Sequence, residues 1–134
     1  MKVSAKVRNS ENHNIVSVRT NKEEKQIEIP SKSTGFGSAV SGGELLLLSI
    51  ATCFCNDLYR EAKKRNLHIS AVDVIVTADF ESEGEAGTNF QYSVNVESEE
   101  SAAEIKNLIV HTDQLAEIHK TLRQGVRIKL NDDI

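Results

Sequence analysis

A single long helical segment constrains the fold of this chain more than any other feature. It begins at about Gly42, where Ser41 and Glu44 have the S-x-x-E spacing of a capping box. It runs on to the cations at 63–65, which suit a helix C-terminus, and Asn66 can adopt the left-handed stop conformation. Such a segment has about 24 residues and a length of about 36 Å. We therefore expect it to be the central helix of the fold.

Alternation of apolar and polar residues on both sides of this helix predicts antiparallel strands. The strands before it cover residues 2–8, 14–20 and 25–29. After it, the alternating runs 72–80 and 90–96 predict a long β-hairpin. The remaining elements are a helix from Ser101, a further turn or two of helix up to Gly125, and a last strand from Val126 to Leu130. This order predicts one α+β domain over residues 1–134.

Composition excludes several classes of function. The formal net charge is −4, whereas nucleic-acid binding needs a basic surface, so we expect no nucleic-acid partner. The longest apolar stretch, residues 45–51, is far shorter than a membrane-spanning helix, so we expect no membrane partner. The N-terminal residues lack the apolar core of a signal peptide, which predicts a cytoplasmic location.

The two cysteines, Cys53 and Cys55, lie on the long helix but face different sides. Helical spacing of 100° per residue separates them by about 200°, so we expect no disulfide between them. Spacing also predicts a core face, which includes Cys55: Leu47, Leu48, Ala51, Phe54, Cys55, Leu58, Tyr59 and Ala62. Cys53 lies at the border of that face. Its residue type alone fits either a small apolar filler or a reactive thiol that solvent can reach.

Charged neighbours of Cys53 affect these two interpretations in opposite ways. Arg60 leans back toward Cys53 and would favour its thiolate, whereas Asp57 would oppose ionisation or pair with Arg60 as a surface ion pair.

The four histidines lie far apart in sequence, and solvated side chains explain them better than a zinc site. We therefore expect neither a bound metal nor a cofactor.

The stretch Ser41-Gly-Gly-Glu-Leu-Leu-Leu-Leu-Ser-Ile-Ala-Thr-Cys53 resembles a motif of the OsmC/Ohr family. The family is named for osmotically inducible protein C and organic hydroperoxide resistance. The preceding Gly-Phe-Gly and the tail Lys-Thr-Leu-Arg-Gln-Gly-Val at 120–126 are also similar, and the resemblance covers nearly the whole chain. It implies an OsmC-like fold and an intertwined homodimer with long central helices.

The same resemblance implies that Cys53 is the peroxidatic cysteine of an enzyme that reduces organic hydroperoxides. The family's resolving cysteine is replaced by Ala116, so an external thiol would have to act as reductant. The position of the family's catalytic glutamate holds Gly43, which leaves Glu44 as the candidate beside its capping role. Arg8 or Arg19 would correspond to the family's N-terminal arginine, and Arg60 is a further candidate.

These residues, together with the resemblance, lead to three functional hypotheses. The preferred one is a cytoplasmic, dimeric peroxidase of the oxidative stress response in which Cys53, Glu44, Arg8 and Arg60 form the site. The second is a non-catalytic dimer that binds a small apolar ligand, with both cysteines structural. The third is transfer or sensing chemistry at Cys53 without turnover.

Overall fold

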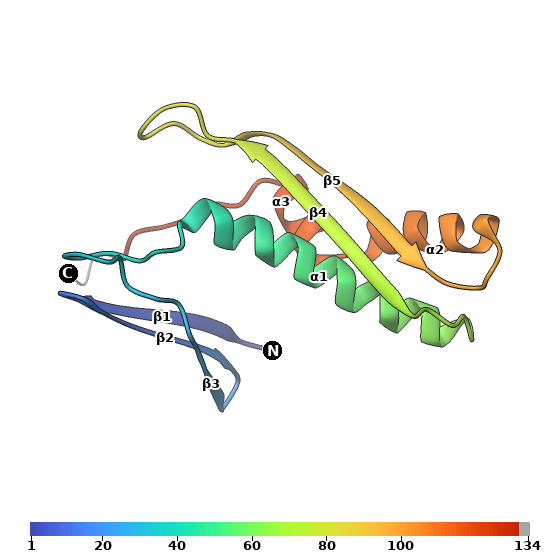
Figure 1. Ribbon diagram of the computed structural model, residues 1–134, viewed down its shortest axis with the longest axis horizontal. Helices are drawn as coiled ribbons and strands as arrows, with labels where there is room; N and C mark the ends of the chain where they lie inside the picture. The colour runs from blue at the N-terminus through green and yellow to red at the C-terminus, as the bar shows by residue number, and fades with distance from the viewer. Residues whose placement is uncertain (132–134) are drawn as a thin grey trace. The chain divides into compact units, whose positions relative to one another are not determined.

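The computed structural model of the protein describes residues 1–131. These residues form two compact units, Met1–Leu45 and the part of the chain from Leu46 onward, and each is described by itself. The mixture of antiparallel strands and helices confirms the predicted α+β class (Figure 1). The expectation of one domain over residues 1–134 stays a prediction.

The N-terminal unit contains a three-stranded antiparallel sheet in the order β1-β2-β3. Its strands are β1 (Val3–Ser10), β2 (His13–Thr20) and β3 (Glu23–Ile27). The predicted strands are thus confirmed, with boundaries shifted by one or two residues. Both connections are tight, and each holds one asparagine in the left-handed region, Asn12 at φ 54° and Asn21 at φ 53°. Asparagine tolerates this conformation because its short polar side chain bonds locally.

The long helix α1 (Gly42–Lys64) begins and ends where the sequence predicts. The Ser41 N–H donates to Glu44 Oε2 at 2.6 Å, and the Glu44 N–H donates to Ser41 Oγ at 3.1 Å. These reciprocal bonds satisfy two amides that have no intrahelical partner, which confirms the capping box. Beyond the last turn, Asn66 adopts the left-handed conformation at φ 54°.

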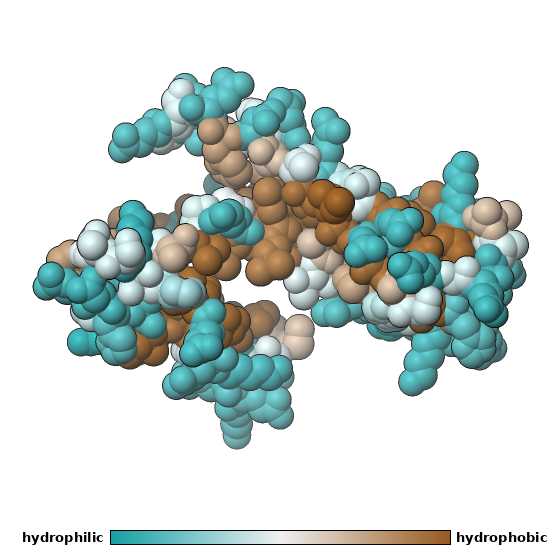
Figure 2. Space-filling model, viewed as in Figure 1, coloured by the Kyte–Doolittle hydropathy of each residue, from teal (hydrophilic) through white to brown (hydrophobic). Residues whose placement is uncertain are grey.

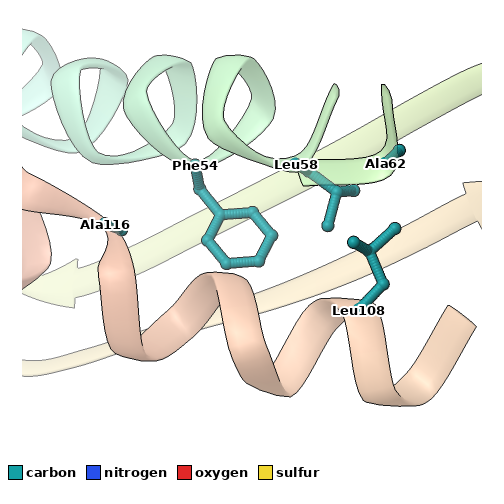
Figure 3. Close-up of a cluster of buried hydrophobic side chains, with 5 residues drawn as sticks. All are labelled: Phe54, Leu58, Ala62, Leu108 and Ala116. Carbon is teal, nitrogen blue, oxygen red and sulfur yellow. The ribbon is translucent and has the colours of Figure 1, made fainter. Parts of the chain in front are cut away.

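The C-terminal unit packs a two-stranded hairpin against helices. Its further elements are β4 (Ala71–Asp79), β5 (Thr88–Glu97), α2 (Ala102–Leu115) and α3 (Glu117–Arg123). The core lies between α1 and α2, where Phe54 and Leu58 point toward Leu108 (Figure 3). Ala62 and Ala116 complete this cluster, and valines of β4 and β5 cover it. The hairpin and helix predictions for this region are therefore confirmed.

The buried face of α1 differs from the prediction. Leu48 and Tyr59 were expected in the core but remain exposed, at 59% and 41%. The predicted core residues Phe54, Leu58 and Ala62 are buried. Ile50, Asp57 and Glu61, which the spacing did not assign to the core, are buried with them. Helical periodicity assigns acidic residues to the solvent side, whereas here Asp57 and Glu61 are buried with cationic partners.

The predicted last strand is not formed. Residues 125–131 have no regular secondary structure, and Ile128 and Leu130 are 95% and 74% exposed. An alternating sequence becomes a strand only when a neighbouring edge supplies backbone hydrogen bonds, and no described strand pairs with this segment.

Exposed apolar side chains also lie on regular elements of the C-terminal unit. Figure 2 shows hydrophobic surface over α1 and β4 on the face in view. Leu48 of α1 and Ile75 of β4 are among the exposed large apolar residues, at 59% and 63%. Among the described helices, none has the length and hydropathy that a bilayer-spanning segment requires.

Candidate functional site around Cys53

Cys53 lies at the partly exposed edge of α1, as its border position predicts. Its thiol donates to Asp57 Oδ2 at 3.6 Å, one helical turn further along α1. It also lies 4.0 Å from Oε2 of Glu117, the first residue of α3. The start of α3 therefore brings a second carboxylate to the thiol from a distant part of the chain.

Arg60 forms ion pairs with these carboxylates. Its Nη1 lies 2.8 Å from Asp57 Oδ1 and 3.9 Å from Glu117 Oε1, and its Nε donates to Glu61 Oε1 at 3.2 Å. The predicted Asp57–Arg60 ion pair is thus formed, although Asp57 itself is buried and not on the surface. We call Cys53, Asp57, Arg60 and Glu117 the thiol cluster. The Arg60 guanidinium group thus forms ion pairs with Asp57 and Glu117 of the cluster and with the neighbouring Glu61.

Electrostatics in the thiol cluster oppose ionisation of the cysteine. Partial burial raises the pKa of Cys53, and the charges of Asp57 and Glu117 raise it further, against a hydrogen bond from the Ile118 backbone that lowers it. Burial also raises the pKa of Asp57, with a further contribution from the Glu117 charge. The raised pKa of Cys53 disfavours its thiolate form at neutral pH.

Substitution of Glu117 by glutamine is expected to make Cys53 more reactive. The change removes one negative charge 4.0 Å from the sulfur and leaves Arg60 to the remaining carboxylates and the thiolate. The pKa of Cys53 should fall, so alkylation by iodoacetamide at pH 7 should accelerate about threefold. The pH at which alkylation reaches half its maximal rate should fall as well.

Glu99→Gln provides the matched control, because this exposed residue carries the same change of charge outside the thiol cluster. It should leave the pH profile of alkylation unchanged. An unchanged profile for Glu117→Gln would contradict the electrostatic account of this cluster.

The donor atoms of Cys53, Asp57 and Glu117 lie within 4.8 Å of one another, a spacing that a metal ion can bridge. A thiolate and two carboxylates are an uncommon donor set for a structural zinc site, in which cysteine and histidine predominate. The Arg60 guanidinium already supplies a positive charge to both carboxylates. The cluster is therefore better described as an ion-paired network than as a metal centre.

The second cysteine lies apart from this cluster. Cys55 is half-buried and borders a shallow surface depression with Ala51, Thr52 and Val74, whereas the sequence predicted it in the core. Both thiols are free, as the helical spacing predicts. Ala116, where the resemblance predicts the family's resolving cysteine, is fully buried immediately before Glu117.

Glu44, Arg8 and Arg19 belong to the N-terminal unit. Glu44 is engaged in the capping box, and its hydrogen bonds with Ser41 lower its pKa. Arg8 is exposed on β1, opposite Ile15 of β2. Arg19 forms an ion pair with Glu24 at 2.6 Å. Among the predicted site residues, the structure thus brings together Cys53 and Arg60, while catalytic roles for Glu44 and Arg8 stay predictions.

The histidine interpretation needs one correction. His119 of α3 was expected in solvent, but it is only 5% exposed, and its ring packs against Tyr92 and Phe54 with centroids 4.8 and 5.6 Å away. His111 is half-exposed, with Nε2 3.4 Å from Glu61 Oε2. Glu117 and Thr121, two positions before and after His119, are exposed. Residues two positions apart lie on nearly opposite sides of a helix, so His119 faces the interior.

Sequence reasoning missed Glu117 and His119 as site residues. Glu117 was seen only as the residue after Ala116, since nothing in its local sequence indicates proximity to Cys53. His119 has a detectable signal, because it lies three residues before Leu122 and three after Ala116 on one helical face.

Comparisons with known proteins agree with this fold. A family model described as OsmC-like protein matches residues 35–131. No curated protein sequence matches the chain. Among solved structures, an OsmC-like protein from Mycoplasma pneumoniae has a TM-score of 0.59 at 20% identity, covering 97% of this chain and 93% of that one.

Two further solved structures carry hydroperoxide-resistance names. The organic hydroperoxide resistance protein OhrB of Bacillus subtilis has a TM-score of 0.55 at 17% identity, with 98% of this chain and 97% of that chain covered. The organic hydroperoxide resistance protein OsmC of Legionella pneumophila has a TM-score of 0.56 at 18% identity, with 97% and 95% covered. At such low identity, these likenesses show a shared fold.

Proposed function

The chain belongs to the OsmC-like protein family, and from this premise we propose that it reduces organic hydroperoxides through Cys53 in the oxidative stress response. The observation that carries the proposal is the placement of a partly exposed thiol in a cluster with carboxylates and a guanidinium group. The names of the OhrB and Legionella structures support the choice of organic hydroperoxides as substrate class.

The reaction begins when the Cys53 sulfur attacks the distal oxygen of the hydroperoxide. A sulfur–oxygen bond forms, the oxygen–oxygen bond breaks, and the thiol proton passes to the departing alkoxide, which leaves as an alcohol. Asp57, which accepts the hydrogen bond from the thiol, is positioned to take that proton during the attack and to pass it on to the departing alkoxide. Arg60 supplies the positive charge that stabilises the developing alkoxide.

The resulting sulfenic acid at Cys53 needs an external reductant. Ala116 offers no thiol at the position of the resolving cysteine, and Cys55 borders a different surface depression. A low-molecular-weight or protein thiol therefore attacks the sulfenic sulfur and releases water, and a second thiol restores Cys53. The cytoplasm supplies such thiols in reduced form, which supports a cytoplasmic location.

Apolar residues near Cys53 favour an organic peroxide over hydrogen peroxide. Ile50 lies one turn before Cys53 on α1 and is 5% exposed, and Leu46 lies one turn earlier. Contact with such side chains lowers the free energy of an alkyl or aryl group by about 25 cal/mol per Å² of apolar surface buried. Hydrogen peroxide has no such group and gains nothing there.

The test is peroxide consumption by the full chain with dithiothreitol as electron donor. We expect cumene hydroperoxide to be consumed faster than in dithiothreitol alone, and faster than an equal concentration of hydrogen peroxide. Consumption equal to the dithiothreitol background for both peroxides would contradict the proposed function.

We further propose that the protein acts as a homodimer. The exposed alternating segment from Val126 to Leu130 has the pattern of a strand without a partner edge among the described residues. Exposed Leu48 and Ile75 add apolar surface of the kind that a second subunit covers. Pairing with a second copy would give this segment its backbone hydrogen bonds.

The variant Ile128→Asp is expected to weaken the dimer. Ile128 is 95% exposed, so the single chain loses no packing when it is changed, whereas a paired strand would bury the new charge. Sedimentation velocity should show a dimer for the unmodified chain and a shift toward monomer for the variant. The control Lys129→Asp alters the neighbouring position, which faces the opposite side of an extended segment, and should shift the equilibrium less.

A further inference from the structure

An apolar cavity of about 340 Å³ lies in the C-terminal unit. Four elements form its walls, with Ile50 from α1, Val76 from β4, Phe90 from β5 and Leu122 from α3 among the lining residues. Cys53 is not one of them. The volume is at the lower end of the range of about 300–1,000 Å³ that is typical of small-molecule sites. Apolar walls of this size suit the body of a small organic molecule.

One buried polar side chain at this cavity lacks a partner. His119 lines the cavity and is 5% exposed, and neither ring nitrogen has a hydrogen-bond partner among the described residues. Buried polar groups in folded proteins are nearly always hydrogen-bonded, so an exception calls for a specific reason. A group bound in the adjoining cavity would provide the missing partner.

The charged groups at the cavity are already paired with each other. Arg123 donates to Asp113 Oδ1 at 2.7 Å and to the Asp113 carbonyl at 3.2 Å. The Tyr92 hydroxyl donates to the same Asp113 carboxylate. This arrangement leaves no uncompensated cation for an anionic ligand. Burial lowers the pKa of His119, with a further contribution from the Arg123 charge, and this favours the neutral imidazole, which has one donor and one acceptor nitrogen.

We infer that this cavity is a binding site for a small neutral molecule with an apolar body and one hydroxyl group, which hydrogen-bonds to His119. A hydroxyl group both donates and accepts, so it can meet either nitrogen of a neutral imidazole. Both nitrogens are covered in the structure, and the ring must therefore turn toward the cavity as the hydroxyl binds. Leu46 and Ile50, which we propose to contact an organic peroxide, also line this cavity, but Cys53 does not, and binding of the hydroxyl compound requires no reaction at Cys53.

Three phenyl compounds of matched shape test this inference. They are 2-phenylethanol, propylbenzene, in which a methyl group replaces the hydroxyl, and 3-phenylpropanoate, which carries a charged head. Titrations followed by NMR of labelled histidine should show tightest binding for 2-phenylethanol, by about tenfold over propylbenzene. The ring signals of His119 should shift with 2-phenylethanol, and those of His13 on β2 should not.

Two substitutions locate the binding. His119→Phe keeps an aromatic ring but removes both nitrogens, and it should abolish the preference for the alcohol over propylbenzene. Leu122→Trp fills the cavity from α3 and should abolish binding of both compounds. Cys53→Ser protein should bind 2-phenylethanol like the unmodified chain, which separates this inference from the proposed peroxidase activity. If His119→Phe does not fold, the histidine signals of the unmodified chain decide the matter.

Several outcomes would overturn the inference. Equal affinity for propylbenzene and 2-phenylethanol would show that His119 takes no part, and tighter binding of 3-phenylpropanoate would refute a neutral ligand. If no compound binds and Leu122→Trp disrupts the dimer in sedimentation experiments, a second copy of the chain covers this cavity in place of a small molecule.

Discussion

Replacing Cys53 by serine is expected to abolish the consumption of cumene hydroperoxide above the dithiothreitol background. Serine keeps the shape of the side chain and its contact with Asp57, but a hydroxyl group cannot form a sulfenic acid. Cys55 is the other cysteine of the chain, and it borders a separate surface depression outside the thiol cluster. Because it cannot replace Cys53 as the attacking thiol, no partial activity should remain. The rate is measured from the loss of peroxide at several protein concentrations.

Cys55→Ser is the matched control for this experiment. It makes the same chemical change two residues away on α1, where the side chain borders a shallow depression outside the thiol cluster. Peroxide consumption should stay within about twofold of the unmodified chain. Equal loss in both variants would point to a folding defect, and full activity in Cys53→Ser would refute the assignment of the reactive thiol.

The substitution Phe54→Ala is expected to lower the free energy of unfolding by about 3–5 kcal/mol. Phe54 has no exposed surface, and its ring packs against Tyr92 with centroids 5.1 Å apart and against the core cluster with Leu58 and Leu108 (Figure 3). Alanine would leave a cavity between α1 and α2. Urea unfolding followed by circular dichroism gives the change in free energy, provided that the transition is two-state.

Phe80→Ala provides the comparison for the core substitution. Phe80 is 51% exposed and pairs edge-on with Phe90, with centroids 6.1 Å apart. Because half of its surface already meets solvent, its loss should cost less than about 1.5 kcal/mol. A cost for Phe54→Ala no larger than that for Phe80→Ala would contradict the position of the core.

Much of the fold could be predicted because local chemistry determines it. The bounds of α1 follow from the Ser41–Glu44 capping box at one end and Asn66 at the other. The β4–β5 hairpin follows from alternation, and its register pairs Val72 with Val96 and Val74 with Val94. Such signals depend on a few neighbouring residues, and tertiary packing here reinforces them.

The buried face of α1 could not be predicted in the same way. Glu61 is buried because Lys64 donates to it at 2.8 Å and Arg60 at 3.2 Å, and these bonds lower its pKa to about 2. A pattern of hydrophobic residues cannot anticipate that a carboxylate is buried beneath cationic side chains that themselves stay exposed to solvent. Leu48 and Tyr59 stay exposed although helical spacing places them on the same side as the buried Phe54, Leu58 and Ala62.

The candidate site was predicted in part. Cys53 was identified from the family motif and Arg60 from its place two helical turns further along α1, and Asp57 lies between them, four residues after Cys53 and three before Arg60. Glu117 reaches the thiol from 64 residues away, so only the packing of α3 against α1 could reveal it. The missing strand at residues 126–130 has a similar cause, since a strand depends on a partner edge that its own sequence does not specify.

The most direct test of the account is to trap the sulfenic acid of Cys53 with dimedone. Reduced protein receives one equivalent of cumene hydroperoxide, and mass spectrometry of the peptides locates the adduct. We predict one adduct per chain, on Cys53, in both the unmodified chain and Cys55→Ser, and none in Cys53→Ser. No adduct beyond that of free cysteine, or equal labelling of Cys53 and Cys55, would contradict the central role of this thiol.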